Sequence, residues 1–148
     1  MNSPLPTPRD ASLAGCVWLA RFLAKARRLL ADQLPPDYVE RFGHPEGVDG
    51  NFFRFFGVGH EQFMDVIRRE PADEAVARWF LALPGIDADR IAAWNAFAER
   101  LGQPGHSMAE RLDEILPRMA ERVDPSKIRS IFDLITADEA GPVPPVSF

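Results

Sequence analysis

The sequence predicts an all-α fold, a compact array of six to eight short helices around a long N-terminal central helix. The first observation concerns residues 12–32. When successive residues are placed about 100° apart, this segment reads as one long helix that is apolar around most of its circumference. A helix of this kind is usually buried among others. The second is that apolar side chains recur at helical spacing in the later segments, and the third is that strand alternation and hairpin dipeptides are missing from the sequence.

Length and composition suggest a single domain. A chain of 148 residues is most simply one folded unit. We expect an extended proline-rich arm over residues 1–11, one helical domain over residues 12–137 and a proline-rich tail over residues 138–148. Proline blocks helix formation in the arm and in the tail.

Side chains that cap or break helices set the expected ends of the central helix. Asp10 or Ser12 can accept hydrogen bonds from its first free amides. At the other end Pro35 and Pro36 exclude continuation, so the helix is expected to stop near Leu34.

The later helices follow from their own start and stop signals. These signals predict short helices over residues 37–42 and 51–56, after His60, from Asp73 to Leu83, from Asp87 to Leu101, after Ser107 and after Asp124. A capping-box pattern of Ser107 with Glu110 marks one start, and Asp124 before Pro125 marks another. Pro117 is expected to kink or split its helix.

A phenylalanine-rich segment follows the second predicted helix. Its aromatic residues are Phe52, Phe53, Phe55, Phe56 and Phe63. We expect most of them to pack the core against the central helix. The alternative is a lined pocket for an apolar or aromatic ligand.

Charge and cysteine content exclude several classes of protein. The net charge of −5 argues against nonspecific binding to nucleic acid, which needs a basic surface. Cys16 is the only cysteine and lies on the apolar face, as expected of a core residue in a reducing compartment. No signal peptide or apolar run of about 20 residues is evident. We therefore expect a soluble cytoplasmic protein that binds neither nucleic acid nor membrane.

Three cations line the narrow side of the central helix that is left for water. Arg21, Lys25 and Arg28 are spaced at i, i+4 and i+7, and we call them the basic stripe. Trp18 lies beside the stripe, and Asp49 and His60 could fold over it from loops. The spacing suits a phosphate or carboxylate ligand. The alternative is an ordinary solvated helix face.

Arg27 falls in the middle of the broad apolar face of the same helix. A guanidinium keeps its charge at ordinary pH, so burial there requires carboxylates, carbonyls or a bound anion. An internal salt bridge or a side chain that reaches the surface is one interpretation, and an anion-binding arginine is the other.

The sequence gives little indication of a metal site or of a catalytic nucleophile. His44, His60 and His106 are widely separated, so we expect no metal site and no cofactor. No Gly-x-Ser-x-Gly elbow or glycine-rich phosphate loop appears. Acidic pairs such as Asp73 and Glu74 fall at helix ends, where capping explains them.

The first helix also carries a family resemblance. The run PRDASLAGCVWLARFLAKAR resembles the opening of the bacterial family described as domain of unknown function 5069, which has a Pro-Arg-Ser-Pro-like segment, a Gly-Gly and a Leu-x-Arg-x-x-Asp-Lys-x-Arg helix. Further matches are Tyr38, Asp49 before FFRFFGV, Trp79 and the closing IFDLITADEAG, so the likeness spans most of the chain. The resemblance implies a small cytoplasmic bacterial helical protein and supplies no activity.

The sequence departs from the family pattern at three positions. Asp10 replaces a small polar residue, and Ala14 replaces the first glycine. Ala24 stands where the family typically has an acid, which removes the acid next to Lys25.

Three hypotheses of function remain. The first is a noncatalytic helical module that binds a protein partner or a small anionic ligand through the basic stripe. The alternative is a small enzyme acting on a phosphate or carboxylate metabolite, with Arg27 or Lys25 orienting the anion and His60 or Asp49 as acid or base. It requires a concave pocket that brings these groups together. The third is a homodimer formed through residues 52–56 or the proline-rich tail.

Overall fold

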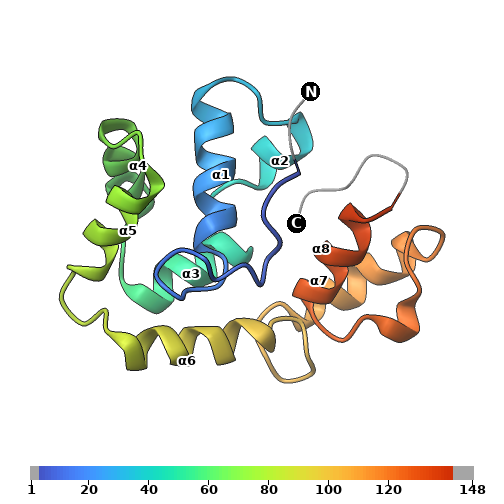
Figure 1. Cartoon of the computed structure of the whole chain (residues 1–148). Coiled ribbons are helices and arrows are strands. Elements are labelled where there is room, and N and C mark those ends of the chain that lie inside the picture. Colours follow the sequence, from blue (N-terminus) through green and yellow to red (C-terminus); the bar gives the residue numbers. More distant parts are fainter. Residues whose placement is uncertain (1–3, 142–148) are drawn as a thin grey trace.

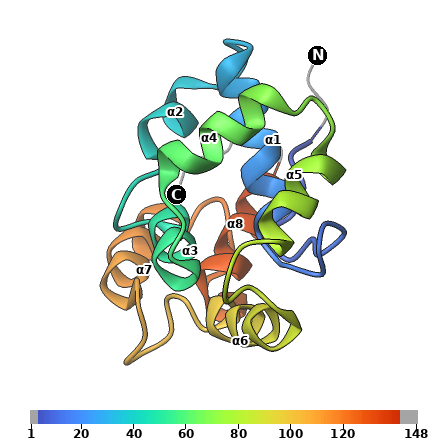
Figure 2. The same cartoon turned by 90° about the vertical axis from the view of Figure 1, so that its left-hand side faces the viewer.

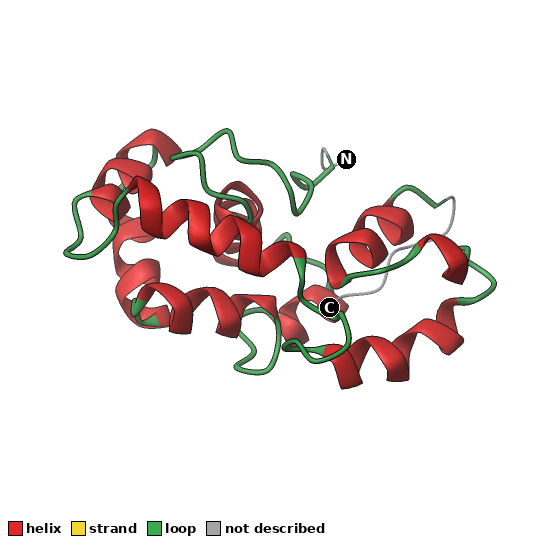
Figure 3. Ribbon diagram, turned by 90° about the horizontal axis from the view of Figure 1, so that it is seen from below, coloured by secondary structure: helices red, strands yellow, loops and turns green. Residues whose placement is uncertain are grey.

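The computed structural model describes residues 4–141, and in this range every regular element is a helix (Figure 3). The all-α prediction is therefore confirmed. The elements are α1 (Leu19–Leu30), α2 (Pro36–Arg41), α3 (Val48–Phe56), α4 (His60–Arg69), α5 (Asp73–Leu81), α6 (Ala88–Glu99), α7 (Ala109–Ile115), the 3₁₀ helices η1 (Leu116–Met119) and η2 (Pro125–Lys127), and α8 (Ile131–Glu139). No helix within the described residues has the length and apolar character to cross a bilayer.

The helices pack around α1 in two groups. Helices α4 and α5 lie on one side of α1, α7 and α8 lie on the other, and α6 runs beneath (Figures 1 and 2). Helix α1 packs on α4, and α6 packs on both α3 and α8. The N-terminal segment runs between α1 and α8 as an extended strip (Figure 1). Through Arg9 this strip contacts both Glu99 of α6 and Asp133 of α8, at 2.7 and 2.6 Å.

An aromatic cluster fills the space between α1, α3, α4 and α6. Phe52 is fully buried, with ring centroids 5.3 Å from Trp94, 5.8 Å from Phe63 and 6.0 Å from Phe80. Phe22 reaches the same cluster from α1. The prediction that the phenylalanine-rich segment packs the core is confirmed, and each such ring contributes about 1.5–3 kcal/mol through burial.

The predicted long central helix is wrong in its first third. Helix α1 has 12 residues, the same length as α6, and begins only at Leu19. The preceding amides bond elsewhere, since Val17 N donates to the Asn95 side chain at 3.0 Å and Trp18 N to the Pro8 carbonyl at 3.0 Å. Trp18 has a positive φ of 75°, which a helix excludes. Tertiary hydrogen bonds therefore override the helical pattern of residues 12–18.

Several predicted caps are wrong for a similar reason. Asp10 accepts from Ser12 N at 2.9 Å in a turn, far from the start of α1. Ser107 donates to Asn51 at 2.9 Å, and Met108 takes the N-cap position of α7. Asp124 caps only the short η2, whereas Ser130 caps α8 by accepting from Asp133 N. The local sequence identifies side chains that can accept a hydrogen bond from an amide. Which amide donates to them depends on the tertiary fold.

Other signals are confirmed. Gly57 ends α3 with a φ of 67°, and His60 begins α4. The chain passes from α-helix to 3₁₀ helix around Pro117, so this helix is split as expected. Helix α8 continues to Glu139, so the predicted tail at residues 138–148 begins inside a helix, and residues 142–148 lie outside the described part.

Asp87 was predicted as a cap, and its side chain accepts from Arg90 N at 2.8 Å. Asp87→Ala is expected to lower the free energy of unfolding by about 1 kcal/mol, because an amide at the start of α6 loses its acceptor. Urea unfolding monitored by circular dichroism measures this change. Asp89→Ala, in the first turn of the same helix, is the control for loss of charge alone. An equal effect of the two substitutions would contradict the capping role.

Candidate functional site

The structure buries most of the basic stripe. Arg21 and Lys25 are only 2% and 6% exposed, and Arg28 is partly buried. The expectation that this face of α1 meets water is therefore wrong. The narrow polar side of the helix faces α3 and α8, each of which brings a carboxylate to it.

Asp49 of α3 binds Lys25 in the interior. The Lys25 ammonium lies 3.2 Å from both oxygens of the Asp49 carboxylate. The same carboxylate accepts from the Trp18 indole at 2.8 Å and from Gly43 N at 2.8 Å. Burial lowers the pKa of Lys25, and the Asp49 charge opposes that shift. The Lys25 ammonium also lies 4.7 Å above the Trp18 ring, which favours the charged form.

Glu139 of α8 binds Arg21. The Arg21 guanidinium contacts both Glu139 oxygens and donates to the Pro6 carbonyl at 3.1 Å. Tyr38 of α2 donates to Glu139 at 2.8 Å. Burial raises the pKa of the Tyr38 hydroxyl, and its hydrogen bond to Glu139 acts in the same direction. This second cluster ties the N-terminal strip, α2 and α8 to α1.

Arg27 forms a partly exposed salt bridge, which agrees with the first of its two interpretations except in its burial. Its guanidinium lies 2.6 Å from the Asp73 carboxylate and donates to the carbonyl of Glu70 at 2.8 Å. Asp73 was predicted to cap α5, but Ala72 occupies that position. Arg27 thus fastens α1 to the junction of α4 and α5.

The predicted neighbours of the stripe are only partly brought together. Trp18 and Asp49 do contact Lys25, as described above. His60 instead packs its ring on Phe42 and Phe53, at 5.4 and 5.3 Å. Of the residues named for an enzyme, Lys25 and Asp49 therefore neutralise each other in the interior. His60 lies apart from them, in contact with aromatic rings.

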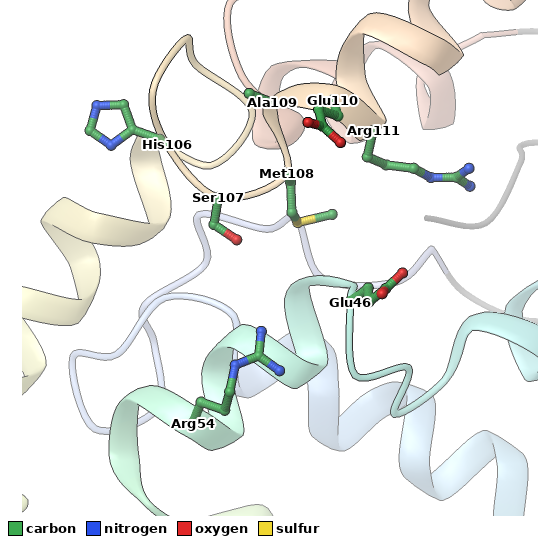
Figure 4. A pocket seen from close by; sticks show the side chains of 8 residues that line it. All are labelled: Glu46, Arg54, His106, Ser107, Met108, Ala109, Glu110 and Arg111. Carbon is green, nitrogen blue, oxygen red and sulfur yellow. The ribbon is translucent and has the colours of Figure 1, made fainter.

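A second group of cations lies in a cleft of about 410 Å³ between α3 and the segment that leads into α7 (Figure 4). We call it the arginine cleft. Its lining residues are Glu46, Arg54, His106, Ser107, Met108, Ala109, Glu110 and Arg111. Arg54 points into it from α3, whereas His106 points away from the other labelled side chains (Figure 4).

Arg111 in the cleft and Arg41 at the end of α2 share one property with Arg21. The Nε atom of each is buried and has no hydrogen-bond partner within the described residues. Burial lowers the pKa of the Arg41 guanidinium, and the charge of nearby Arg111 lowers it further. Neither side chain forms a salt bridge within residues 4–141. This region therefore combines a cavity with donors that lack an acceptor.

Sequence analysis missed the arginine cleft. Arg54 and Arg111 come from two different helices, and no spacing along the chain links them. The only local signal was the charged character of each residue, which a solvated surface explains equally well. A site of this kind becomes visible only when α3 and α7 are placed together.

The described residues also limit other chemistry. No group of three His, Cys, Asp or Glu side chains within residues 4–141 could hold a metal ion. Cys16 is fully buried, and burial raises the pKa of its thiol to about 12, so it carries no thiolate at neutral pH. The arginine cleft contains neither Lys25 nor Asp49 among its lining residues.

Comparison with known proteins gives one match. Residues 4–141 match the model of the family described as "Domain of unknown function (DUF5069)". No curated protein matches the chain. No solved structure matches it.

Proposed function

Since the chain belongs to this family of unknown function, we propose its function from its own side chains: a noncatalytic helical module that binds a small anionic ligand in the arginine cleft. The observation that carries the proposal is the cleft lined by Arg54 and Arg111, in which the buried Nε atom of Arg111 lacks an acceptor. The family description itself states no activity.

A buried guanidinium nitrogen without an acceptor is costly. A buried donor without an acceptor costs about 1–3 kcal/mol, and more when it is charged. Arginine presents five donors in a planar fork that fits the oxygens of a carboxylate or phosphate. An anion bound in the cleft would pair with the guanidinium of Arg111.

The dimensions of the cleft support a small molecule. Its volume of about 410 Å³ lies within the range of roughly 300–1,000 Å³ that is usual for ligand pockets. The basic stripe is less suitable, since Asp49 and Glu139 already neutralise Lys25 and Arg21. We therefore propose Arg54 and Arg111 as the residues that contact the ligand.

The small enzyme that was the alternative hypothesis has less support. It requires a concave site that brings the anion-orienting Arg27 or Lys25 together with His60 or Asp49. Lys25, Asp49 and His60 do not line the arginine cleft. Protein partners and a homodimer remain weaker proposals, because no interface feature of the described residues favours them.

A bacterial cytoplasmic location is part of the same proposal. Cys16 supports it, because a single buried thiol that forms no disulfide is usual for proteins of a reducing compartment. The bacterial origin rests on the family resemblance.

Arg111→Gln is expected to abolish anion binding, because it removes the guanidinium in the cleft. Thermal unfolding is measured with inorganic phosphate, propyl phosphate and butyrate. A ligand at about 100 times its Kd stabilises the native state by about 2.7 kcal/mol, which raises Tm by roughly 5–10 °C for a chain of this size. The shift is expected in the natural protein and not in the variant.

Arg118→Gln is the matched control. Arg118 lies on the neighbouring η1, and its side chain is 70% exposed and pairs with Glu114. It should keep the full shift in Tm. The proposal fails if no anion stabilises the natural protein, or if Arg111→Gln retains the shift.

A further inference from the structure

Asn51 of α3 is a buried residue whose side-chain amide joins the two walls of the arginine cleft. It is only 6% exposed. Its nitrogen donates to the carbonyl of Gly47 at 2.8 Å, and its oxygen accepts from the Ser107 hydroxyl at 2.9 Å. Gly47 directly follows Glu46, which lines the cleft, and Ser107 is itself a lining residue. One side chain therefore connects the loop before α3 to the segment before α7.

The same hydrogen bond links the elements that carry the two arginines. Arg54 lies one turn after Asn51 on α3, and Arg111 lies in the first turn of α7, shortly after Ser107. The carbonyl of Ser107 also accepts from Gly102 N at 2.8 Å, which holds the segment before α7 from its other side. Within the described residues, α3 and α7 do not form one of the extensively packed helix pairs. Their relative position therefore depends on individual contacts such as this one.

A fixed separation of the arginines favours binding even though Asn51 is not among the residues that line the cleft. An amide group that is bonded through both its nitrogen and its oxygen is held in one orientation. A ligand that bridges two elements loses less freedom on binding when these elements are already held in place. The affinity of the cleft should therefore depend on a residue that the ligand does not touch.

We propose that Asn51 is the positioning residue of the arginine cleft. Through Ser107 it holds Arg111 at the separation from Arg54 that a bound anion bridges. The inference rests on the proposed anion-binding function and adds to it the device that keeps the two cationic walls in register.

Asn51→Ala tests the inference. Isothermal titration calorimetry with inorganic phosphate, propyl phosphate and butyrate measures Kd in the natural protein and in the variant. The anion that binds the natural protein is expected to bind the variant with a Kd about fivefold to tenfold higher, because the two walls are no longer held together before binding.

Asn95→Ala is the matched control. Asn95 also joins two segments through both ends of its amide, since it accepts from Val17 N at 3.0 Å and donates to the carbonyl of Gly15 at 2.9 Å. It does not line the cleft. This variant should lower Tm of the unliganded protein, as Asn51→Ala should, but it should leave Kd unchanged.

Ser107→Ala removes the same hydrogen bond from its other side, and it keeps the test decisive if Asn51→Ala does not fold. It is expected to raise Kd in the same direction. The double variant of Asn51→Ala and Ser107→Ala should bind no more weakly than Asn51→Ala alone, because two substitutions that remove one shared contact are not additive. Circular dichroism of the unliganded variants checks that they are folded.

The outcomes separate this inference from the proposed function. An unchanged Kd in either folded single variant overturns the positioning role and leaves anion binding intact. An equal rise of Kd in Asn95→Ala also overturns it, because the effect would then follow from general stability. Additive losses in the double variant would assign Ser107 to direct contact with the ligand and would overturn it as well. If none of the three anions binds the natural protein, both proposals fail.

Discussion

Asp49→Ala is expected to lower the free energy of unfolding by about 3–5 kcal/mol, because it leaves the buried Lys25 ammonium without its counter-charge. The carboxylate also accepts from the Trp18 indole and from Gly43 N, and both donors would lose their partner. Unfolding in urea, followed by circular dichroism, measures the loss. Arg68→Ala removes an exposed ion pair and is expected to cost less than about 1 kcal/mol.

A double substitution separates the charge from the packing. Lys25→Met with Asp49→Leu replaces the ion pair by apolar groups of similar size, and such replacements are often neutral or stabilising. The double variant is expected to be more stable than Asp49→Ala. A loss in Asp49→Ala no larger than that in Arg68→Ala would contradict the importance of the buried pair.

Gly50→Ala is expected to destabilise the protein by about 3 kcal/mol, although alanine usually stabilises a helix interior relative to glycine. A Cβ atom at this position in α3 would lie 2.1 Å from the carbonyl oxygen of Pro45 and 2.4 Å from its carbonyl carbon. These are backbone atoms, so the loop before α3 would have to move. That loop carries Glu46, and its Pro45 carbonyl accepts from Arg54.

The control for this effect is Gly59→Ala. Gly59 precedes α4, and the nearest atom to a Cβ there is 3.9 Å away. Thermal and urea unfolding should show a change below about 1 kcal/mol for this variant. Comparable stability of the two alanine variants would contradict this prediction, because it would mean that the loop before α3 moves at little cost in free energy. Gly50→Ala should also weaken anion binding, because it displaces a wall of the arginine cleft.

The helical elements were largely predictable, because their apolar spacing and stop signals are local. Gly57 and the split at Pro117 are examples of signals that act within one or two turns. The start of α1 was not predictable, since the amides of Val17 and Trp18 bond to Asn95 and Pro8, which only the fold brings near. A helical wheel shows the periodicity of side chains. It does not show acceptors elsewhere in the chain that compete for the backbone amides.

The candidate site was less predictable than the fold. The stripe of Arg21 and Lys25 was correctly seen as one face of a helix, and Trp18 and Asp49 were correctly placed beside it. Its burial was missed, because the acceptors Asp49 and Glu139 lie on helices far along the chain. The arginine cleft was missed altogether, since each of its cations is unremarkable in its own segment.

The cluster around Glu139 has a consequence for how the molecule is made. Arg21 and Tyr38 lie 118 and 101 residues before the acid that satisfies them. During synthesis from the N-terminus, the first helices emerge long before α8 exists. Contacts between distant segments also form slowly, because the intervening chain must be closed into a loop. The nascent chain therefore leaves Arg21 and Tyr38 without their acceptor until α8 has been synthesised.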